Sequence, residues 1–455
     1  MCRILKNRII YRSTNCKAPE VSFREALLKG IAPDGGLYVP GEIPVLSQDE
    51  LESFRKKEYN EIAVDILKKY VDDEIGDIEL RKICTEAYNF EIPLEKVTEG
   101  KYILRLDRGP TFSFKDFAAR MMSRMMQHFL AGENGKLTIL TATSGDTGSA
   151  VASAFFGLKN INVIILFPKD EVSLMQRKQM TTLGENISII AVDGKFDDCQ
   201  SLVKRAFLDT SLSHIPFSSA NSINIGRLLP QSVYYCYAWS RSTVKFSDKI
   251  IFSVPSGNFG NLTAGILAKR MGLPVKRFIV ATNSNDEVPV FLNSSKYEPV
   301  VPSRNCISSA MNVGHPSNLA RIISFYNGNI DDKGLIIRQP DMKQLQNDLY
   351  GVAVTDETTR KTILDTWESY NVLLEPHGAV AWRGVCDYIA ENSSNDIIIS
   401  LETAHPAKFP AEIQKILNFT PTLPAGMSEI ESKNESYDTI PADYNELKKL
   451  IIRKN

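Results

Sequence analysis

A lysine and two glycine-rich loops are the residues of this chain whose types and spacing could do chemistry. Lys115 lies in GPTFSFKDFAARMM, and the loops SGDTG and SGNFGN follow at residues 144–148 and 256–261. Burial among apolar side chains favours the neutral amine of a lysine, which can then attack an aldehyde and form a Schiff base. Such a lysine, followed by an anion-binding loop, is the arrangement that a pyridoxal phosphate enzyme needs. Taken alone, Lys115 is equally well explained as a surface lysine whose alkyl stem packs on neighbouring phenylalanines.

The loop SGNFGN lies between an apolar, strand-like run and a predicted helix. Gly257 and Gly260 allow the backbone to approach an anion closely, and the N-terminus of the helix adds partial positive charge. Phosphate is therefore the expected ligand, although the loop matches neither the dinucleotide motif G-x-G-x-x-G nor a P-loop. A tight turn that binds nothing is the alternative for this loop in isolation.

Two further segments could bind anions. In SGDTG, Ser144 and Thr147 offer hydroxyls, and the start of the predicted helix could bind a carboxylate. Plain N-capping by Ser144 or Asp146 explains this loop about as well. Asn221 and Arg227 belong to a segment that combines polar donors with a cation just before a helix, which suits a second anion. An N-cap with a solvated arginine is the alternative there.

The residues around the last predicted strand favour ligand contacts but no metal site. Thr403 follows the apolar run that ends at Leu401, and parallel sheets place ligand contacts at the carboxyl ends of their strands. A hydroxyl satisfied within a turn is the alternative for Thr403. His377 and His405 lack a second histidine at metal-ligand spacing, so no metal is expected.

Continuous apolar runs that alternate with helical patterns predict an α/β fold with mainly parallel sheets covered on both faces. The predicted strands cover residues 137–143, 161–167, 187–192, 250–254, 277–282 and 396–401. The predicted helices that follow them cover residues 150–156, 175–180, 196–208, 262–271, 355–370 and 378–390. We expect a helical N-terminal unit over residues 1–95, α/β units over 96–220 and 221–430, and a C-terminal segment over 431–455.

The composition argues against a nucleic-acid-binding, membrane-spanning or disulfide-rich protein. A chain of 455 residues is too long for one ordinary core, and its net charge of −1 gives no overall attraction to nucleic acid or an anionic membrane. No run reaches the roughly 18 apolar residues of a membrane helix. Because no C-x-x-C pair is present, we expect buried, unpaired thiols in a reducing compartment, the cytoplasm. The cysteines are Cys2, Cys16, Cys84, Cys199, Cys236, Cys306 and Cys386.

Together, the segments from residue 21 to residue 408 resemble the threonine synthases of the longer type that is found in many bacteria and fungi. The motifs that carry the resemblance are APDGGLYVP, GPTFSFKDF, TATSGDTGSAVA, SANSINIGRLLPQ, SVPSGNFGNLTAG, EPHGAVA and TAHPAKF. One departure lies near the start, where the family often has Y-x-S-T-R-G and this chain has YRSTNC at residues 11–16. We therefore assign no function to the residues before Val21.

The resemblance implies the fold type II architecture of pyridoxal phosphate enzymes, as in the β subunit of tryptophan synthase. It implies that Lys115 is catalytic and carries the cofactor, and that Thr403 hydrogen-bonds the pyridine nitrogen. The residues implied to bind the cofactor phosphate through backbone amides are Gly257, Asn258, Phe259, Gly260 and Asn261. Those implied for the substrate are Ser144, Gly145, Asp146 and Thr147 at its carboxylate, and Asn221, Ser222 and Arg227 at its phosphate. Asp146 would also flank the cofactor ring, where shorter relatives have an asparagine that contacts the ring hydroxyl.

The implied reaction converts O-phosphohomoserine and water to L-threonine and phosphate, by γ-elimination followed by β-hydration, as the last step of threonine biosynthesis. A phospholyase or a serine/threonine dehydratase on the same fold is the alternative activity, and a catalytically silent relative is the alternative of another class. The expected partners are the small-molecule substrate and, at most, further copies of the chain, in a monomer or simple homo-oligomer without nucleic acid or membrane.

Overall fold

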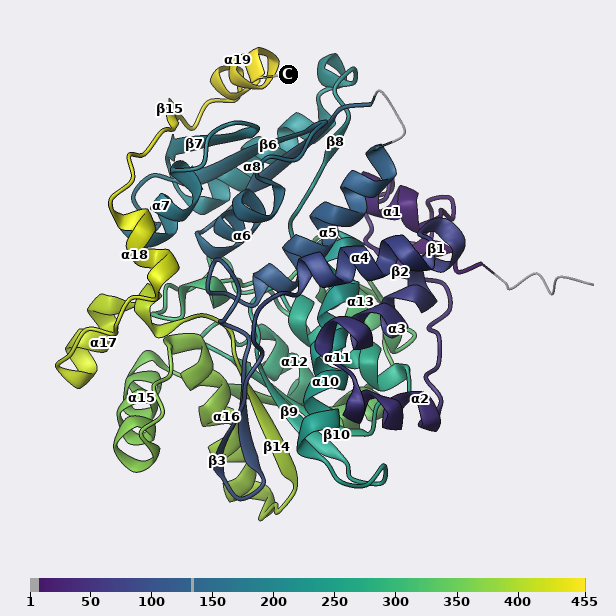
Figure 1. Cartoon of the computed structure of the whole chain (residues 1–455), viewed down its shortest axis with the longest axis vertical. Coiled ribbons are helices and arrows are strands. Elements are labelled where there is room, and N and C mark those ends of the chain that lie inside the picture. The colour runs from purple at the N-terminus through teal and green to yellow at the C-terminus, as the bar shows by residue number, and fades with distance from the viewer. Residues whose placement is uncertain (1–7, 132–134, 455) are drawn as a thin grey trace, which may run out of the picture.

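Two separate sheets form the centre of the molecule, and a helical unit packs beside them (Figure 1). The computed structural model describes residues 8–131 and 135–454. The larger sheet has the strand order β13-β10-β9-β14-β4-β3, and all neighbours are parallel except β3 and β4. Its strands are β3 (Leu94–Thr98), β4 (Lys101–Arg105), β9 (Ile250–Pro255), β10 (Val275–Thr282), β13 (Leu349–Ala353) and β14 (Ile397–Glu402).

The smaller sheet has the order β15-β7-β6-β5-β8 and is parallel throughout. Its strands are β5 (Leu137–Ala142), β6 (Ile161–Pro168), β7 (Ile187–Asp193), β8 (Phe217–Ser218) and β15 (Asp438–Pro441). Strands such as β5 are buried along their whole length because helices cover both faces, which explains why their sequences are continuous apolar runs. The predicted α/β class with mainly parallel sheets is thus confirmed.

Helices cover each sheet on its two faces. On the outer face of the smaller sheet, α8 (Phe196–Leu208) and α19 (Tyr444–Lys454) close one core. On the outer face of the larger sheet, α15 (Asp356–Tyr370) and α16 (Pro376–Asn392) close another. The largest core joins the inner faces of both sheets. The helices on that side and at the edges are α5 (Lys115–Leu130), α6 (Asp146–Phe155), α7 (Leu174–Thr181), α9 (Ile225–Leu228), α10 (Ser232–Ser242), α11 (Gly260–Arg270), α12 (Glu287–Ser294), α13 (Leu319–Phe325), α14 (Met342–Asp348), α17 (Pro410–Leu417) and α18 (Ala425–Glu431).

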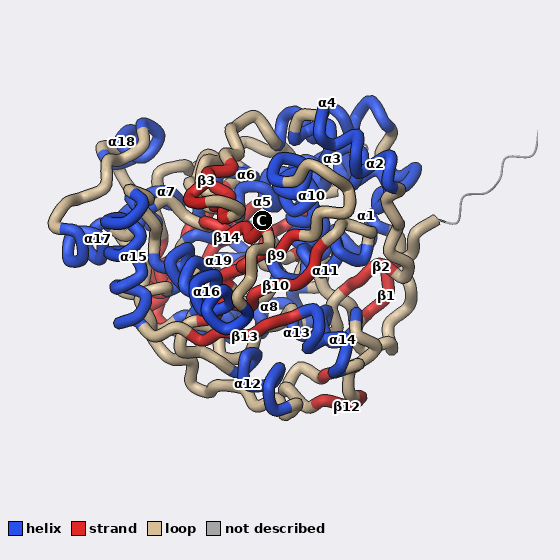
Figure 2. Tube along the Cα trace, turned by 90° about the horizontal axis from the view of Figure 1, so that it is seen from below, coloured by secondary structure: helices blue, strands red, loops and turns tan. Residues whose placement is uncertain are grey.

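The N-terminal part is mainly helical, with α1 (Phe23–Lys29), α2 (Gln48–Ser53), α3 (Tyr59–Val71) and α4 (Asp77–Ala87). These helices lie together on one side of the molecule, opposite α15, α17 and α18 (Figure 2). A short ladder of β1 (Tyr11–Ser13) and β2 (Tyr38–Pro40) and a hairpin of β11 (Asn329–Ile330) and β12 (Ile336–Arg338) complete the strands of the described chain.

The sheets do not follow the predicted boundaries at residues 96 and 431. Strand β4 pairs with β14, so the segment just after residue 96 belongs to the larger sheet rather than to the unit that contains Lys115. Strand β15 pairs with β7 and adds an edge to the smaller sheet, so the C-terminal segment is part of that unit. We therefore propose unit boundaries that assign β4 to the unit of the larger sheet and β15 to the unit of the smaller sheet.

Two smaller expectations also need correction. Helix α6 begins at Asp146 rather than at residue 150, since the polar SGDTG residues form its first turn. Buried thiols are confirmed for Cys84, Cys199 and Cys236, whereas Cys16 and Cys386 are exposed and Cys306 is half-buried. Cys2 lies outside the described residues. Across the described chain, none of the helices has the length and apolar character to cross a membrane, and no cluster of acidic, histidine and cysteine side chains could hold a metal.

Candidate active site

A cavity of about 1090 Å³ opens where the carboxyl ends of the strands of both sheets meet the N-termini of α5, α6 and α11. The predicted site residues that line it are Lys115, Ser144, Asp146, Thr147, Asn221, Ser222, Arg227, Gly257, Asn258, Phe259, Gly260, Asn261 and Thr403. Gly145 is buried, and it is the single predicted site residue that does not line the cavity. The structure thus brings three separate loops and one lysine around a common space.

Lys115 is the first residue of α5, and its side chain is only 13% exposed. Its Nζ atom lies 3.8 Å from Oδ2 of Asp146 and 4.8 Å from the centre of the Phe114 ring. Burial lowers the pKa of the Lys115 amine, the Asp146 carboxylate opposes this shift, and the charges of Lys408 and Arg227 reinforce it. The structure therefore excludes a solvated surface lysine at this position and favours a neutral, nucleophilic amine.

The backbone around Lys115 is tied to the end of strand β14. The amide of Phe114 donates to the carbonyl oxygen of Thr403 at 2.9 Å, and Ser113 forms a bridge to Ala404. The buried Asp116 carboxylate accepts hydrogen bonds from the amide and the hydroxyl of Thr111 at 2.8 and 2.7 Å. Residues on both sides of Lys115 therefore hold the amine in place at the start of the helix.

The SGDTG loop leaves the N-terminus of α6 open to the cavity. Its N-cap is Gly145, which has a φ of 133° and no side chain with which to cap, so neither Ser144 nor Asp146 is the N-cap. The hydroxyl oxygen of Thr143 accepts hydrogen bonds from the amides of Gly145 and Gly148 at 3.0 and 2.8 Å and fixes the turn from behind. The first amides of a helix lack intrahelical acceptors, so this end can bind an anion.

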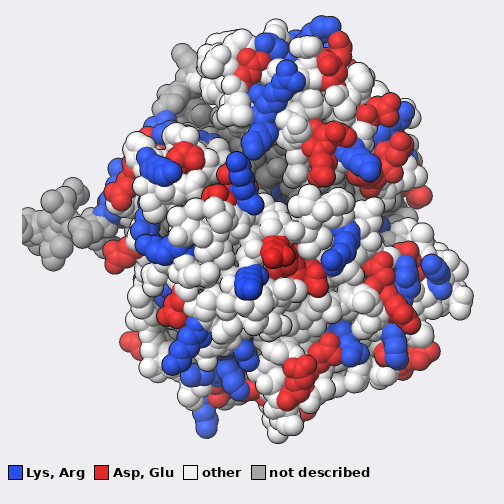
Figure 3. Space-filling model, turned by 180° about the vertical axis from the view of Figure 1, so that it is seen from behind, with Lys and Arg blue, Asp and Glu red and all other residues white. Residues whose placement is uncertain are grey.

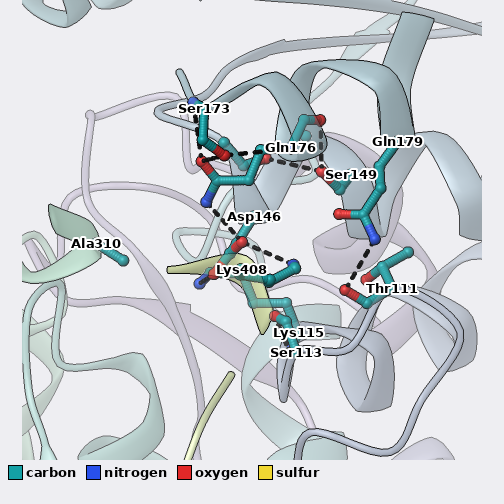
Figure 4. A network of polar contacts seen from close by, with 12 residues as sticks. Thr111, Ser113, Lys115, Asp146, Ser149, Ser173, Gln176, Gln179, Ala310 and Lys408 are labelled. Carbon is teal, nitrogen blue, oxygen red and sulfur yellow. Dashed lines mark hydrogen bonds and ion pairs between the residues drawn. The ribbon is translucent and has the colours of Figure 1, made fainter. Parts of the chain in front are cut away.

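Asp146 is buried and takes part in a polar network (Figure 4). Its Oδ1 atom accepts hydrogen bonds from Nε2 of Gln176 and Nζ of Lys408, both at 2.8 Å. Burial alone would raise the pKa of this carboxyl, but the ammonium groups of Lys408 and Lys115 and both hydrogen bonds hold the pKa well below its ordinary value. Asp146 is therefore a carboxylate.

The SGNFGN loop is fixed by the side chain of Asn258. Its Nδ2 donates to Oγ of Ser222 at 2.5 Å, and its Oδ1 accepts from the amide of Ser317 at 2.6 Å. Phe259 has a φ of 61°, and α11 begins at the next residue. A Cβ atom on Gly257 would lie 2.7 Å from the carbonyl oxygen of Ala310, so only glycine fits here. The loop therefore presents backbone amides rather than side chains to the cavity.

Asn221, Ser222 and Arg227 also line the cavity, and Ser222 adjoins the SGNFGN loop through its hydrogen bond with Asn258. Arg227 is 3% exposed, and its Nη1 donates to the carbonyl oxygen of Ala220 at 2.5 Å. Its Nε and the Oδ1 of Asn221 are buried without a hydrogen-bond partner in the described part of the protein. Burial lowers the pKa of Arg227 to about 10, so the group remains charged at neutral pH. Asp116 raises the pKa of Arg227 from a distance, but no carboxylate of the described residues forms an ion pair with it. A buried cation without such a pair is costly and indicates an anion site.

Thr403 lies at the end of β14 and contacts the N-terminus of α16. Its hydroxyl donates to Oε1 of Glu375 at 3.4 Å, and the same carboxylate caps α16 by accepting from the amides of His377 and Gly378. Nδ1 of His377 donates to Glu375, and its Nε2 accepts from the amide of Ala310 at 3.1 Å. The hydroxyl of Thr403 is thus connected to a buried acidic group.

Several residues of the site have no predicted role. Lys408, Glu375 and His377 occur in the motifs TAHPAKF and EPHGAVA, which the sequence marks without showing what they contact. The N-terminal unit also contributes Asn15 and Asp34 to the cavity wall, so the segment before Val21 does reach the site. The available signal for Lys408 was a lysine five residues after Thr403, within the same motif TAHPAKF.

Comparisons with known proteins agree with this geometry. Family models for the threonine synthase N terminus, for pyridoxal-phosphate-dependent enzymes and for the threonine synthase C-terminal region match residues 10–88, 91–401 and 378–451. Threonine synthase of Serratia marcescens is 40% identical over 95% of this chain and 96% of its own length, and that of Escherichia coli is 41% identical over 95% and 97%.

Solved structures give the same result. The pyridoxal-phosphate-bound threonine synthase of Brucella melitensis has a TM-score of 0.92 at 34% identity and covers 98% of this chain and 99% of its own. Yeast threonine synthase has a TM-score of 0.88 at 31% identity, with 98% of each chain covered. A tomato threonine deaminase has a TM-score of 0.54 at 17% identity over 84% of this chain and 97% of its own, a likeness of fold alone. The resemblance and the fold type that the sequence predicted are therefore confirmed.

Proposed function

Because this chain belongs to the threonine synthase family of pyridoxal-phosphate-dependent enzymes, we propose that its cavity converts O-phosphohomoserine and water to L-threonine and phosphate. The chain is a pyridoxal-phosphate-dependent enzyme of threonine biosynthesis. The observation that supports this substrate is the combination, around one cavity, of a buried amine, an open helix N-terminus and a separate buried arginine. A substrate with both a carboxylate and a phosphate needs two anion sites besides the site for the cofactor phosphate.

The residues present fit pyridoxal phosphate. The amides of residues 257–261 would bind its phosphate at the start of α11, where Gly257 leaves no room for a side chain. Lys115 would form the covalent bond to its aldehyde, and Thr403 would contact its ring nitrogen. When bound, the cofactor supplies the electron sink that makes protons next to the amino group removable. Lys408 is a poor candidate for the covalent bond, because its amine is already engaged with Asp146 at 2.8 Å.

Different groups of the chain would bind the substrate and transfer its protons. The N-terminus of α6, with Ser144 and Thr147, would hold the substrate carboxylate. The lowered pKa of Lys115 would let its amine take the proton from the α carbon of the substrate. After handing that proton on to the bound cofactor, the same amine would be free to take one from the β carbon. Arg227 and Asn221 would bind the substrate phosphate and stabilise the negative charge that develops as the phosphate leaves the γ carbon.

We further infer that the enzyme acts in the cytoplasm, as a monomer or simple homo-oligomer and without nucleic acid or membrane. Support comes from the near-neutral net charge of −1 and from the biosynthetic role of the family. On the face shown in Figure 3, acidic and basic side chains are interspersed, and no field of one sign covers it. Such a mixed surface offers no broad electrostatic attraction to a polyanion.

Product analysis tests the proposed reaction. The enzyme is incubated with O-phosphohomoserine, and threonine and phosphate are followed together. Equal amounts of both are expected. An oxo acid and ammonia in place of threonine would contradict the proposal and identify the phospholyase alternative, for which O-phosphothreonine is the matched substrate. No product from either compound would favour the silent relative.

A further inference from the structure

A second lysine, Lys408, is buried beside Lys115 (Figure 4). It ends the short helical turn Pro406–Lys408, five residues after Thr403, and its side chain has no exposed area. Its Nζ lies 2.8 Å from Oδ1 of Asp146. Lys408 does not line the cavity, whereas Lys115 does. The reaction described above uses no group of Lys408.

The carboxylate of Asp146 lies between the two amines. Oδ1 is occupied by Lys408 and by Nε2 of Gln176, and Oδ2 lies 3.8 Å from Nζ of Lys115. Gln176 is itself held at the start of α7 by Ser173, whose hydroxyl donates to its Oε1 at 3.0 Å. Two distant segments, the start of α7 and the turn that ends at Lys408, thus fix the carboxylate, and its orientation toward Lys115 is defined without any contribution from Lys115.

The single carboxylate of Asp146 can compensate the charge of only one of the two neighbouring lysines, Lys408 and Lys115. One buried carboxylate can neutralise one ammonium group, and a second uncompensated ammonium would carry a large desolvation cost. Lys408 is the partner at hydrogen-bonding distance, and Lys115 is not. If Lys408 were absent, the buried Asp146 would have Lys115 as its nearest cation and would favour the protonated form of that amine.

We propose that Lys408 is a positioning residue that keeps Lys115 uncharged, by taking up the negative charge of Asp146. The proposal rests on the proposed role of Lys115 as the amine that binds the cofactor. Burial lowers the pKa of Lys115, and four charged groups also act on it: Asp146 and Glu375 raise the pKa, and Lys408 and Arg227 lower it. Lys408 therefore acts on the reactive amine both directly, by repulsion, and indirectly, by pairing with the carboxylate.

The test uses the full-length chain freed of cofactor, to which pyridoxal 5′-phosphate is added at a series of pH values. The rate of covalent bond formation is followed by absorbance, and it rises with pH as Lys115 loses its proton. For Lys408→Met we expect the apparent pKa of the amine to rise by about one to three units, because the variant removes a repelling charge and leaves the Asp146 carboxylate to favour the protonated amine. At a fixed pH well below that pKa, each unit by which the apparent pKa rises lowers the rate about tenfold.

Further variants test the direction in which each charge shifts the apparent pKa of Lys115. Asp146→Asn leaves the charge of Lys408 uncompensated and should lower the apparent pKa, and the double variant Lys408→Met/Asp146→Asn should return it toward the wild-type value. Lys361→Met is the matched control, because Lys361 forms an exposed pair with Asp365 at 2.7 Å, and it should change nothing. A role of Lys408 in folding alone would move the melting temperature and leave the pH profile unchanged.

An unchanged pH profile in folded Lys408→Met protein would overturn the proposal. If that variant does not fold, Asp146→Asn is compared with the double variant, and an equal apparent pKa in these two proteins would overturn it as well. Peptide mapping after borohydride reduction separates this result from the role of Lys115. Label on Lys115 with no shift rejects the role of Lys408, and label on Lys408 in the wild-type protein rejects both assignments.

Discussion

Replacement of Arg227 by methionine should weaken catalysis without weakening the fold. The guanidinium is 3% exposed, its Nε has no partner within the described residues, and burial lowers its pKa from 12.5 to about 10. A depressed pKa on a cation means that burial of the charge destabilises the folded state at neutral pH. The shift corresponds to about 3 kcal/mol, at 1.36 kcal/mol per unit. The folded protein escapes this cost only when the guanidinium loses its proton, above about pH 10, or when a substitution removes the charge.

The same charge should stabilise the bound substrate phosphate. Loss of charged hydrogen bonds costs about 1.5 to 3 kcal/mol, which lowers kcat/KM for O-phosphohomoserine by about 10- to 100-fold. We expect a higher KM and a slower release of phosphate, with normal cofactor content, because the hydrogen bonds of Asn258 that fix the SGNFGN loop go to Ser222 and Ser317 and not to Arg227. Steady-state kinetics and cofactor absorbance measure these effects. The free energy of unfolding from urea titration should stay equal to that of the wild type or rise.

Arg321 provides the matched control. It is as buried as Arg227, but its guanidinium donates to the carbonyl oxygens of Tyr38, Ser222 and Ile223 and to the side chain of Asn318. Burial lowers the pKa of Arg321 to about 9, so its charge is costly as well. Arg321→Met nevertheless leaves several buried acceptors unpaired, and we therefore expect it to destabilise the protein relative to Arg227→Met. The reasoning is refuted if Arg227→Met destabilises the protein as much as Arg321→Met does, or if it loses the cofactor while the kinetics for bound substrate stay normal.

Two further predictions concern the phosphate loop and the acid side of the stability curve. Gly257→Ala should weaken cofactor binding about 10- to 100-fold, because the new Cβ meets backbone atoms of Ala310 and Met311 at 2.7 and 2.8 Å. Equilibrium titration with pyridoxal phosphate measures the affinity. An affinity equal to that of the wild type would contradict the proposed fit of the loop to the cofactor phosphate. Burial lowers the pKa of His405 from 6.5 to about 4, so the unfolded chain binds a proton that the folded chain does not, and stability should fall as the pH drops from 6.5 to 4. His405→Asn, which keeps a side-chain acceptor for the amide of Ala407, should flatten this decline in urea titrations, and an unchanged slope would show that other groups cause it.

The sequence predicts those parts of the site that depend on short segments. A strand, a glycine-rich turn and a helix occur together within each anion loop, so the residues around Gly257 and Ser144 could be placed correctly. Helix α8 begins at Phe196 and ends at Leu208 as predicted, because its apolar residues keep a helical period from end to end. Helix α6 begins earlier than predicted because its first turn is polar and interrupts that period.

The parts that the sequence does not predict depend on contacts between distant residues. Strand β4 joins the larger sheet through pairing with β14, where Lys101 lies opposite Ile398, 297 positions later, and no local pattern encodes this partner. In the same way, Lys408 and Asp146 are 262 positions apart. A lysine in TAHPAKF is as compatible with solvent as with burial, and only the fold decides that it neutralises a carboxylate beside the reactive amine.

The most direct measurement of the central claim is the position of the covalent bond to the cofactor. The enzyme with bound pyridoxal phosphate is reduced with borohydride, digested, and mapped by mass spectrometry. We expect the pyridoxyl group on the peptide that contains Lys115, with the peptide of Lys408 unmodified. Modification at any other lysine, or none at all, would contradict the account of a buried neutral amine at the start of α5.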